Sequence, residues 1–500
     1  MKLNKKLPAF ITLTTALLAA ASITASADVI TDWNLITVNA TKVAPALNSN
    51  LASRIDAIEA IAVYDAVNYI RQFGTPYHYY VNNSGSAQAA AAQAAHDVLL
   101  NYFPSQATAL NTALANSLAN ITDGPIGNGT TVGAAAAADI IALRASDGSS
   151  PNVTYPGPAT NAIAPGVYQL TPNIPVVTVP PFTFGAGINL QWGTVTPFVL
   201  AATNQFRPGP PPALNSAQYS NDLAQVKSLG SLNSVTRTTD QTHIAQFYKH
   251  DAELTVNEAA RQLVLANGLS LEQSALVFLL TDIAEADARI AVWDAKYTYL
   301  FWRPITALNA NADGTVTNDY AAWQPLINDP NHPEYPSGHG GTVNAGFEVL
   351  KAFFGDQNTL LLHTTTAGEP ARLIQSLTVG ETENVLARIY DGVHFWFSDT
   401  TGQTIGNQVA AYVLANGPHL IAQSSTNSTS LLGIATYPAI TITGNVGQAY
   451  RIDYATSLAP TNWTTLKYVT LPTTTPYLIF DNAPVGLNPQ RFYRAVSVAN

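Results

Sequence analysis

Two cations lie seven residues apart on the mostly apolar stretch 271–302. On one continuous helix, Lys296 and Arg303 would be two turns apart and would face the same way, with Trp293 one turn earlier. Pro304 disfavours the helical conformation in Arg303, so we expect the helix to end there. Only 11% of the chain is charged. Although two cations can simply mark a solvated face, aligned cations on an apolar helix favour a bound anion.

A second stretch, Pro336-Ser337-Gly338-His339, has the residues of a helix start. Ser337 is a good N-cap, and Gly338 allows backbone N–H groups to approach a ligand closely before a helix expected over about 342–354. Helix N-termini favour negative charge and offer unpaired donors. His339 would lie beside the bound anion. Taken alone, Ser-Gly-His also occurs in ordinary turns.

A third stretch carries Arg388 and His394, six residues apart. On an unbroken helix their side chains would point about 120° apart. Gly392 lies between them and can end the helix, which would let His394 return toward Arg388. Because a lone histidine in such a run is more often a packed structural residue, the interpretation depends on all three stretches together.

The three stretches, in this order and with these spacings, resemble the vanadium-dependent haloperoxidase and type-2 phosphatidic acid phosphatase superfamily, in its secreted bacterial haloperoxidase-like branch. The resemblance implies a mainly α fold with a helical-bundle core. It implies that the oxygens of vanadate or phosphate are held by Lys296, Arg303, Ser337, the Gly338 backbone N–H and Arg388. It also implies an acid–base role for His339. His394 would be either the single protein ligand to vanadium or the nucleophile of a phosphohistidine intermediate.

Two positions depart from the family pattern. Ala387 stands where a serine is usual, and Ser398 stands where an aspartate is usual four residues after the histidine, with Asp399 one place later. An aspartate there commonly orients the histidine, so the residue that orients His394 is left open. The carboxylate that pairs with Arg303 is open too, and the candidates on the same expected helix are Asp282, Glu285 and Asp287.

Two activities fit one such pocket, because vanadate and phosphate share tetrahedral oxygens and charge class. In the peroxidase hypothesis, vanadium on His394 Nε2 acts as a Lewis acid toward hydrogen peroxide. His339 removes the peroxide proton, and Lys296 polarises the oxygen that a halide attacks, giving hypohalous acid. In the phosphatase hypothesis, His394 attacks phosphorus, His339 protonates the leaving oxygen, and water hydrolyses the phosphohistidine.

Two residues favour the peroxidase over a secreted acid phosphatase. Trp293 matches a tryptophan of the haloperoxidases. His332 lies five residues before Ser337, where bromide-oxidising relatives often carry histidine and chloride-specialised ones resemble phenylalanine. We therefore expect hydrogen peroxide and bromide or iodide as substrates and vanadate as cofactor, while a surface position for His332 is the alternative. An organic acceptor and the oligomeric state, a homodimer included, stay open. A third hypothesis is a non-catalytic anion-binding protein, but the paired histidines argue against it.

The N-terminus has the pattern of a secretory signal peptide over residues 1–27. Three lysines precede an apolar run, and Ala25-Ser26-Ala27 fits a cleavage site. We therefore expect an exported protein, periplasmic or extracellular. The chain has no cysteine and hence no disulfide, yet it is long enough to bury a core without one. We expect no later apolar run to span a bilayer.

The formal charge argues against nucleic acid as a partner. Without the three lysines of the signal peptide, 19 basic and 32 acidic residues remain, a formal charge of −13. A polyanion would be repelled by such a surface, whereas a few cations focused in one pocket suit a small anion.

The remaining periodicity divides the chain into a helical part and a β part. We expect a catalytic domain over 28–417, a polar linker over 418–434 and a small C-terminal module over 435–500. Further helices are expected at 54–71, 88–102, 105–119, 133–145, 216–228, 236–247 and 399–415. The Pro- and Gly-rich segment 147–212 should be an ordered excursion packed on these helices. In the C-terminal module, five runs with a period of two predict a β-sandwich similar to immunoglobulin-like modules.

Overall fold

The structure is a computed structural model that describes residues 28–43, 47–78, 83–158, 164–172, 184–311, 314, 320–421, 439–442, 448–456, 463–470, 477–480 and 492–497. The chain divides into two compact units at the boundary between Ala422 and Gln423. The expected signal peptide and most of the expected linker lie outside the described residues.

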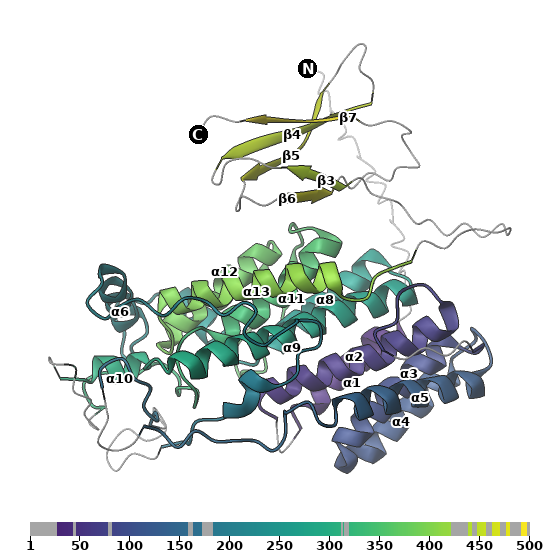
Figure 1. The fold of residues 1–500 in the computed structure, drawn as a ribbon, viewed down its shortest axis with the longest axis horizontal. Helices are drawn as coiled ribbons and strands as arrows, with labels where there is room; N and C mark the ends of the chain where they lie inside the picture. The colour runs from purple at the N-terminus through teal and green to yellow at the C-terminus, as the bar shows by residue number, and fades with distance from the viewer. Residues whose placement is uncertain are drawn as a thin grey trace, which may run out of the picture. The chain divides into compact units, whose positions relative to one another are not determined.

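The first unit is helical (Figure 1). Its helices are α1 (Val29–Ala40), α2 (Ser49–Arg71), α3 (Ala87–Tyr102), α4 (Ala107–Ala119), α5 (Ile126–Arg144), α6 (Ala217–Leu229), α7 (Thr239–Tyr248), α8 (Ala252–Asn267), α9 (Leu271–Tyr299), α10 (Pro304–Leu308), α11 (Gly338–Phe354), α12 (Leu377–Asp391) and α13 (Trp396–Asn416). Two short 3-10 helices, η1 (Pro104–Gln106) and η2 (Leu190–Thr194), and an antiparallel pair, β1 (Leu360–Leu362) with β2 (Arg372–Ile374), complete it.

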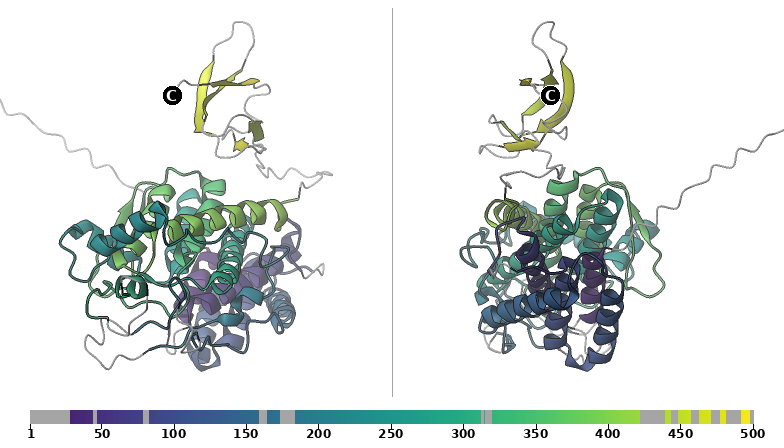
Figure 2. Two further views of the ribbon diagram at one scale, coloured as in Figure 1. Left: turned by 60° about the vertical axis from the view of Figure 1, so that its left-hand side comes forward. Right: turned by 90° about the vertical axis from the view of Figure 1, so that its right-hand side faces the viewer.

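Helix α9 runs through the centre of this unit and packs against α2, α11 and α13 (Figure 2). It begins with a capping box in which Ser270 and Gln273 satisfy each other's backbone N–H groups. Nearly every residue from Ser274 to Trp293 is buried. An amphipathic helix would leave one face in water, so α9 is the core helix about which the others are arranged.

Small residues bring α11 and α13 into backbone contact. A Cβ added at Gly402 would lie 2.5 Å from the carbonyl oxygen of Ser337, and one added at Gly340 would lie 2.8 Å from that of Asp399. Real Cβ atoms do not approach backbone this closely, so both positions require glycine. The start of α11 is therefore fixed directly against α13.

The helix of Lys296 ends earlier than expected and does not reach Arg303, so the two residues do not share a helix face, whereas the non-helical conformation expected for Arg303 is confirmed. Helix α9 ends at Tyr299, Leu300 is left-handed (φ 46°), and Arg303 is extended (φ −80°, ψ 156°) at the start of α10. Pro304 forces this conformation on the residue before it. Two other predictions are confirmed: Ser337 caps α11, and α12 ends before Gly392, whose φ is +86°.

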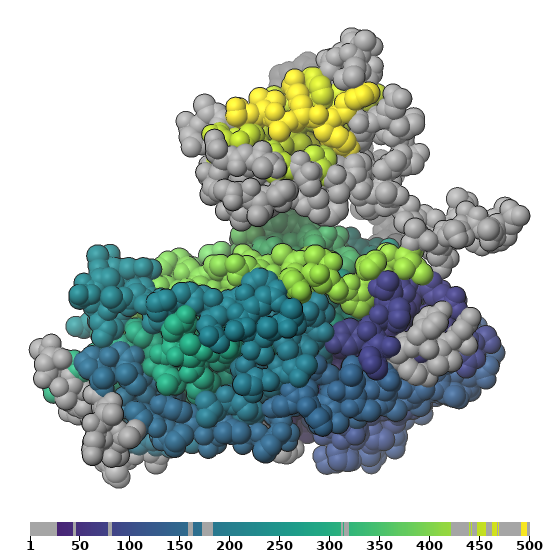
Figure 3. Space-filling view, in the orientation of Figure 1, coloured from purple at the N-terminus to yellow at the C-terminus, as the bar shows by residue number. Residues whose placement is uncertain are grey.

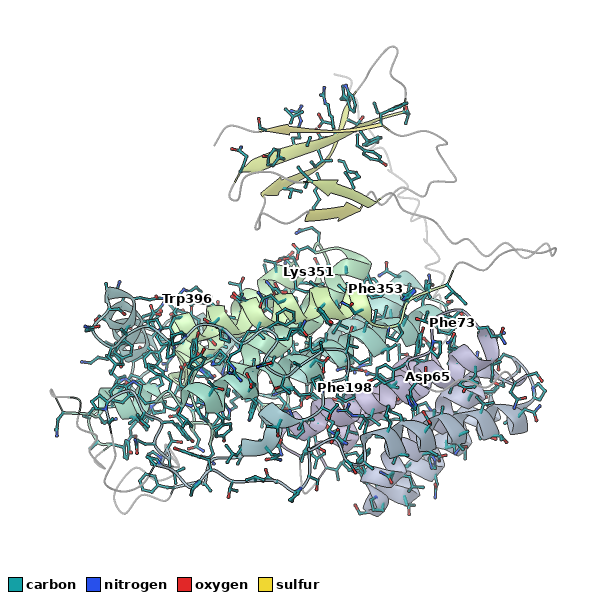
Figure 4. All side chains as sticks on the ribbon, in the orientation of Figure 1. Asp65, Phe73, Phe198, Lys351, Phe353 and Trp396 are labelled. Carbon is teal, nitrogen blue, oxygen red and sulfur yellow. The ribbon has the colours of Figure 1, made fainter. Side chains whose placement is uncertain are left out.

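Much of the described part of segment 147–212 is packed on the helices, as predicted, although residues 150–154 and 209–210 are exposed. The carboxylate of Asp287 on α9 accepts backbone N–H groups from Phe198, Val199 and Leu200 at 2.7, 2.8 and 2.9 Å. Phe198 (Figure 4) is buried. In the space-filling view, teal residues around position 200 form part of the surface of the helical unit (Figure 3). One carboxylate thus anchors this segment to the core helix.

Helix α5 departs from the expectation that no later run could span a bilayer. By length and composition it is suited to cross a membrane. In the structure it packs instead along α3 and α2. A Cβ at Gly133 would collide with the carbonyl of Ala90, so glycine and alanine allow the two helix backbones to approach closely.

The described residues of the second unit include five short strands at the five predicted positions: β3 (Ala439–Ile442), β4 (Ala449–Ala455), β5 (Thr464–Thr470), β6 (Tyr477–Phe480) and β7 (Phe492–Ser497). They form an antiparallel pair, β3 with β6, and an antiparallel three-stranded sheet ordered β5-β4-β7. Ile442, Ile452 and Val469 form a small buried cluster. These small sheets alone do not define an immunoglobulin-like sandwich.

Helices α2, α8 and α9 bury four carboxyl groups together with the amide of Asn257: Asp56, Glu59, Asp282 and Glu285. Asn257 Nδ2 donates to Asp282 at 2.9 Å and to Glu285 at 3.3 Å. Burial raises the pKa of Asp282 to about 7 and raises the pKa values of the other three well above their usual range. The cluster is therefore largely protonated at acidic pH.

This cluster should make the protein less stable as the pH rises. An unfolded aspartate ionises near pH 4, whereas folded Asp282 ionises near pH 7, so between these values the folded state binds more protons. The free energy of unfolding should fall across that window and then level off. Thermal unfolding at pH 5 and pH 8 tests this. Asp282→Asn should flatten the dependence and Glu348→Gln should not. A dependence that is unchanged in Asp282→Asn would contradict the assignment.

Candidate active site

The three stretches predicted from the sequence come together inside the helical unit. Lys296 is in the last turn of α9, Arg303 starts α10, Arg388 is in the last turn of α12, and His394 lies between α12 and α13. All four side chains are buried, as is Ser337 at the start of α11. Five polar groups from separate segments therefore share one interior region.

Arg303 joins two of the stretches. Its Nη1 donates to the carbonyl oxygen of Val393 at 2.7 Å and lies 3.3 Å from His394 Nε2. Its Nε donates to the carbonyl of His332 at 3.0 Å. Because Arg303 is fully buried, these contacts fix its guanidinium beside the histidine. Sequence spacing had suggested this convergence but by the wrong route, along a single helix.

Lys296 is held by backbone oxygens. Its Nζ donates to the carbonyls of Pro333 and Glu334 at 2.8 and 3.0 Å and lies 5.6 Å from the centre of the Trp293 ring. Burial, reinforced by the positive charge of Arg303, lowers the pKa of Lys296 well below its usual value. A bound anion would favour the charged form of this ammonium group.

His394 contacts a carboxyl group that the sequence did not identify as a site residue. Its Nδ1 lies 2.8 Å from Glu334 Oε1, which also accepts the backbone N–H of Phe395 at 2.9 Å. Glu334 is fully buried. Burial and the neighbouring Arg303 and Lys296 together lower the pKa of His394 well below its usual range. A neutral ring that donates from Nδ1 leaves Nε2 as the nitrogen with a free lone pair.

The start of α11 is fixed by hydrogen bonds of Ser337 and borders the candidate site. Ser337 Oγ accepts the N–H of Gly340 at 3.4 Å, and the Ser337 N–H donates to the carbonyl of Ser398 at 3.1 Å. A Cβ at Gly338 would lie 3.2 Å from the Trp293 ring, so the indole packs beside the helix start. The N-terminal end of this helix favours negative charge at that position.

Arg388 keeps one donor without a partner. Its Nη1 donates to Asp391 Oδ2 at 2.6 Å. Its Nε is buried and makes no hydrogen bond to any residue that the structure describes. Burial raises the pKa of Asp391 to about 7. An unpaired buried donor is costly, so this nitrogen favours an acceptor such as an oxyanion.

His339 is only partly buried, and its Nε2 donates to the carbonyl of His250 at 2.9 Å. Burial and the charge of Arg388 lower the pKa of His339 well below its usual value. The ring is therefore neutral near pH 7. With Nε2 protonated, Nδ1 is the nitrogen that can take up a proton.

His332 lies inside the site, so the alternative of a surface position is wrong. Its Nδ1 is 3.0 Å from Arg303 Nη2, and its ring centre is 4.9 Å from that of Trp293. Only 8% of the residue is exposed. Both residues predicted to favour the peroxidase thus border the same cations.

The candidates for the carboxylate partner of Arg303 were wrong. Asp287 binds backbone N–H groups elsewhere on α9, while Asp282 and Glu285 belong to the buried acid cluster. Asp329 Oδ1 instead lies 3.9 Å from Arg303 Nε. Asp329 and Glu334 both precede Ser337 in the loop before α11. The only sequence signal for these two carboxylates was their place in the short segment 329–339, which also carries four of the predicted site residues.

Comparison with known proteins extends these observations. The family described as the VCPO second helical-bundle domain matches residues 276–422, a range that contains every predicted site residue. Vanadium chloroperoxidase of Curvularia inaequalis is 26% identical over 216 residues, which cover 36% of this chain and 34% of that protein. The chain thus spans about a third of the length of this relative.

Solved structures share the fold. A bacterial vanadium-dependent iodoperoxidase superimposes with a TM-score of 0.67 at 22% identity, over 79% of this chain and 98% of the other. Apo- and holo-type bacterial vanadium-dependent chloroperoxidase superimpose with TM-scores of 0.58 and 0.59 at 15% and 16% identity, over 74% of this chain and 94% and 92% of theirs. The helical unit therefore has the fold of these bacterial enzymes.

Fold and site together define a helical bundle that gathers cations and a histidine around a helix N-terminus. With the sequence match over 276–422, this part of the chain is similar to the vanadium haloperoxidases, and the helical unit shares their fold.

Proposed function

We propose that this protein is a vanadate-dependent haloperoxidase that uses hydrogen peroxide to oxidise a halide to hypohalous acid. The observation that carries the proposal is the convergence of three buried basic side chains, a helix N-terminus and the unprotonated Nε2 of His394. A capture protein would need the donors but not the two histidines. The similar proteins reported above are vanadium chloroperoxidases and a vanadium iodoperoxidase.

The residues fit vanadate. Arg388 Nε is a buried donor that makes no bond to any described residue, and an oxyanion would supply its acceptor. Oxygens of the anion would be held by Lys296, Arg303, Ser337, the Gly338 N–H and Arg388. His394 would bind vanadium through Nε2, because its Nδ1 is engaged by Glu334. This is the donor set that a tetrahedral oxyanion with one nitrogen ligand requires.

Bound vanadate would supply the Lewis acid that activates hydrogen peroxide toward a halide. The chain's own groups would do the rest. His339 would accept the peroxide proton at Nδ1, since its Nε2 already donates to His250. Lys296 would donate to the oxygen that the halide attacks. Burial lowers the pKa of Lys296, and a bound anion would oppose this shift and favour the charged form of the amine.

We propose further that bromide and iodide are oxidised in preference to chloride. The support is His332, whose ring lies against Trp293 and Arg303 at the cation site. An imidazole there gives a more polar wall than phenylalanine would. The iodoperoxidase among the similar structures agrees with this choice but does not determine it.

A halide-oxidation assay tests the proposal. The purified full-length protein would be stripped of bound anion, reloaded with orthovanadate and assayed with hydrogen peroxide and iodide, bromide or chloride. We expect activity that vanadate restores and phosphate suppresses, with iodide and bromide ahead of chloride. A chloride rate equal to the others would contradict the halide choice. Absence of any oxidation, alongside phosphomonoester hydrolysis inhibited by vanadate, would overturn the peroxidase in favour of a phosphatase.

We also propose an organisation for the whole chain. Residues 1–27 would export the protein to the periplasm or medium, 28–417 would form the catalytic domain, and 418–434 would be a linker. Residues 435–500 would complete an immunoglobulin-like β-sandwich, and the support is two antiparallel sheets around a small apolar cluster. N-terminal sequencing of the secreted protein would test cleavage after Ala27.

A further inference from the structure

We propose that Glu334 is the positioning residue for His394, in the place of the aspartate that relatives carry four residues after this histidine. The inference rests on the proposed function, because it concerns the residue assigned as the vanadium ligand. It starts from a contact that connects two loops: Glu334 lies before α11, and His394 lies between α12 and α13.

The first argument is the hydrogen bond itself. Glu334 Oε1 lies 2.8 Å from His394 Nδ1, and both side chains are buried. The same Oε1 accepts the backbone N–H of Phe395, so it faces Nδ1 as an acceptor and Nδ1 donates to it. The lone pair is then confined to Nε2, which lies 3.3 Å from the donor Arg303 Nη1. Glu334 needs a donor at Nδ1 and Arg303 needs an acceptor at Nε2, so both contacts favour the tautomer protonated at Nδ1.

The second argument is that the carboxylate is itself fixed. The N–H of Phe395 donates to the same Oε1 at 2.9 Å. The Glu334 backbone is held on both sides: its N–H donates to the carbonyl of Phe301 at 3.0 Å, and its carbonyl accepts from Lys296 Nζ at 3.0 Å. Because both the backbone and the side chain of Glu334 are fixed by other contacts, its carboxylate can determine the orientation of the His394 ring.

The third argument is the absence of a competitor among the described residues. Ser398 occupies the usual aspartate position, but its Oγ is 3.5 Å from His394 Nδ1 and 3.3 Å from the carbonyl of Glu334. Asp399, one residue later, makes no hydrogen bond to His394 within the described part of the chain; its electrostatic partner among these residues is Ser337. Glu334 therefore compensates for the missing aspartate from another loop.

The experiment moves the carboxylate from position 334 to position 398. Three variants of the full-length protein would be compared with wild type: Glu334→Leu, Glu334→Gln, and the double variant Glu334→Leu/Ser398→Asp. Histidine ¹⁵N spectra of the vanadate-free protein, with the His394 signals assigned by their loss in His394→Ala, report the tautomer. Calorimetric titration with orthovanadate reports affinity separately. Asp329→Asn is the matched control, a buried carboxylate that lies near Arg303 and makes no contact with His394.

We expect wild type and Asp329→Asn to show His394 protonated at Nδ1. Glu334→Leu should lose this single tautomer and bind vanadate about 10–100-fold more weakly, and the double variant should regain both. Glu334→Gln keeps an acceptor, so it should keep the tautomer and lose about tenfold in affinity. It is the informative variant if Glu334→Leu fails to fold.

An unchanged tautomer and unchanged vanadate affinity in either Glu334 variant would overturn the inference. Failure to rescue by Ser398→Asp in a folded double variant would also count against it. The tautomer is read without vanadate or halide, so a wild-type protein that shows the Nδ1–H form but no halide oxidation would overturn the proposed activity and leave the role of Glu334 standing.

Discussion

Replacement of His394 by alanine should abolish vanadate-dependent halide oxidation, with a loss of at least about a thousandfold in kcat/KM. The variant removes the only side-chain nitrogen that we propose as a ligand to vanadium. It also leaves the Arg303 Nη1 donor and the buried Glu334 carboxylate without their contact at 3.3 and 2.8 Å. Steady-state assays with saturating orthovanadate measure the loss.

Loss of folding must be separated from loss of function in this variant. Loss of one buried hydrogen-bond partner of Glu334 costs about 1–3 kcal/mol, so the thermal midpoint should fall while the helical circular dichroism remains. His363→Ala is the matched control, because His363 is largely exposed and bonds Glu258 away from the site. Substantial turnover by a folded His394→Ala protein would show that the site has been assigned to the wrong residues.

The sequence predicted the cations and both histidines because their chemistry depends on residue type and short spacing. A helix cap at Ser337 and a helix stop at Gly392 are local events, and the structure confirms both. The prediction for Arg303 was right about convergence and wrong about the path. The chain turns at Leu300, a left-handed residue that no propensity rule singled out.

What the sequence could not supply were contacts between segments distant along the chain. Glu334 reaches His394 across sixty positions. The acidic residues on α9 illustrate the same limit, since Asp287 anchors a loop while Asp282 joins a buried cluster. Spacing along a helix identifies a shared face, but the partner of each carboxylate is decided by which segment packs on that face.

The C-terminal unit shows a different limit. Alternation of apolar residues correctly located five strands, because a period of two is a local signal. How two- and three-stranded sheets combine is set by contacts between strands far apart in sequence, such as β4 with β7. Strand positions were therefore predictable, whereas the sandwich is still a hypothesis.

Asp287→Ala should be among the most destabilising single substitutions in the helical unit. One carboxylate satisfies three backbone N–H groups at 2.7–2.9 Å, and alanine would leave all three without their acceptor in the interior. Each unsatisfied buried donor costs about 1–3 kcal/mol, so we expect a loss of about 3 kcal/mol or more in the free energy of unfolding. Urea unfolding followed by circular dichroism measures it.

The effect should reach the active site through a short route. The segment held by Asp287 is preceded along the chain by η2. In η2, Gly193 packs directly against the backbone of Asp294, which lies between Trp293 and Lys296 on α9. Release of this segment should expose it to limited proteolysis and weaken vanadate binding in the folded fraction. Asp287→Asn keeps one acceptor oxygen and should lose less stability. Equal stability of the alanine and wild-type proteins would mean that the segment is held by its apolar contacts and not by this carboxylate.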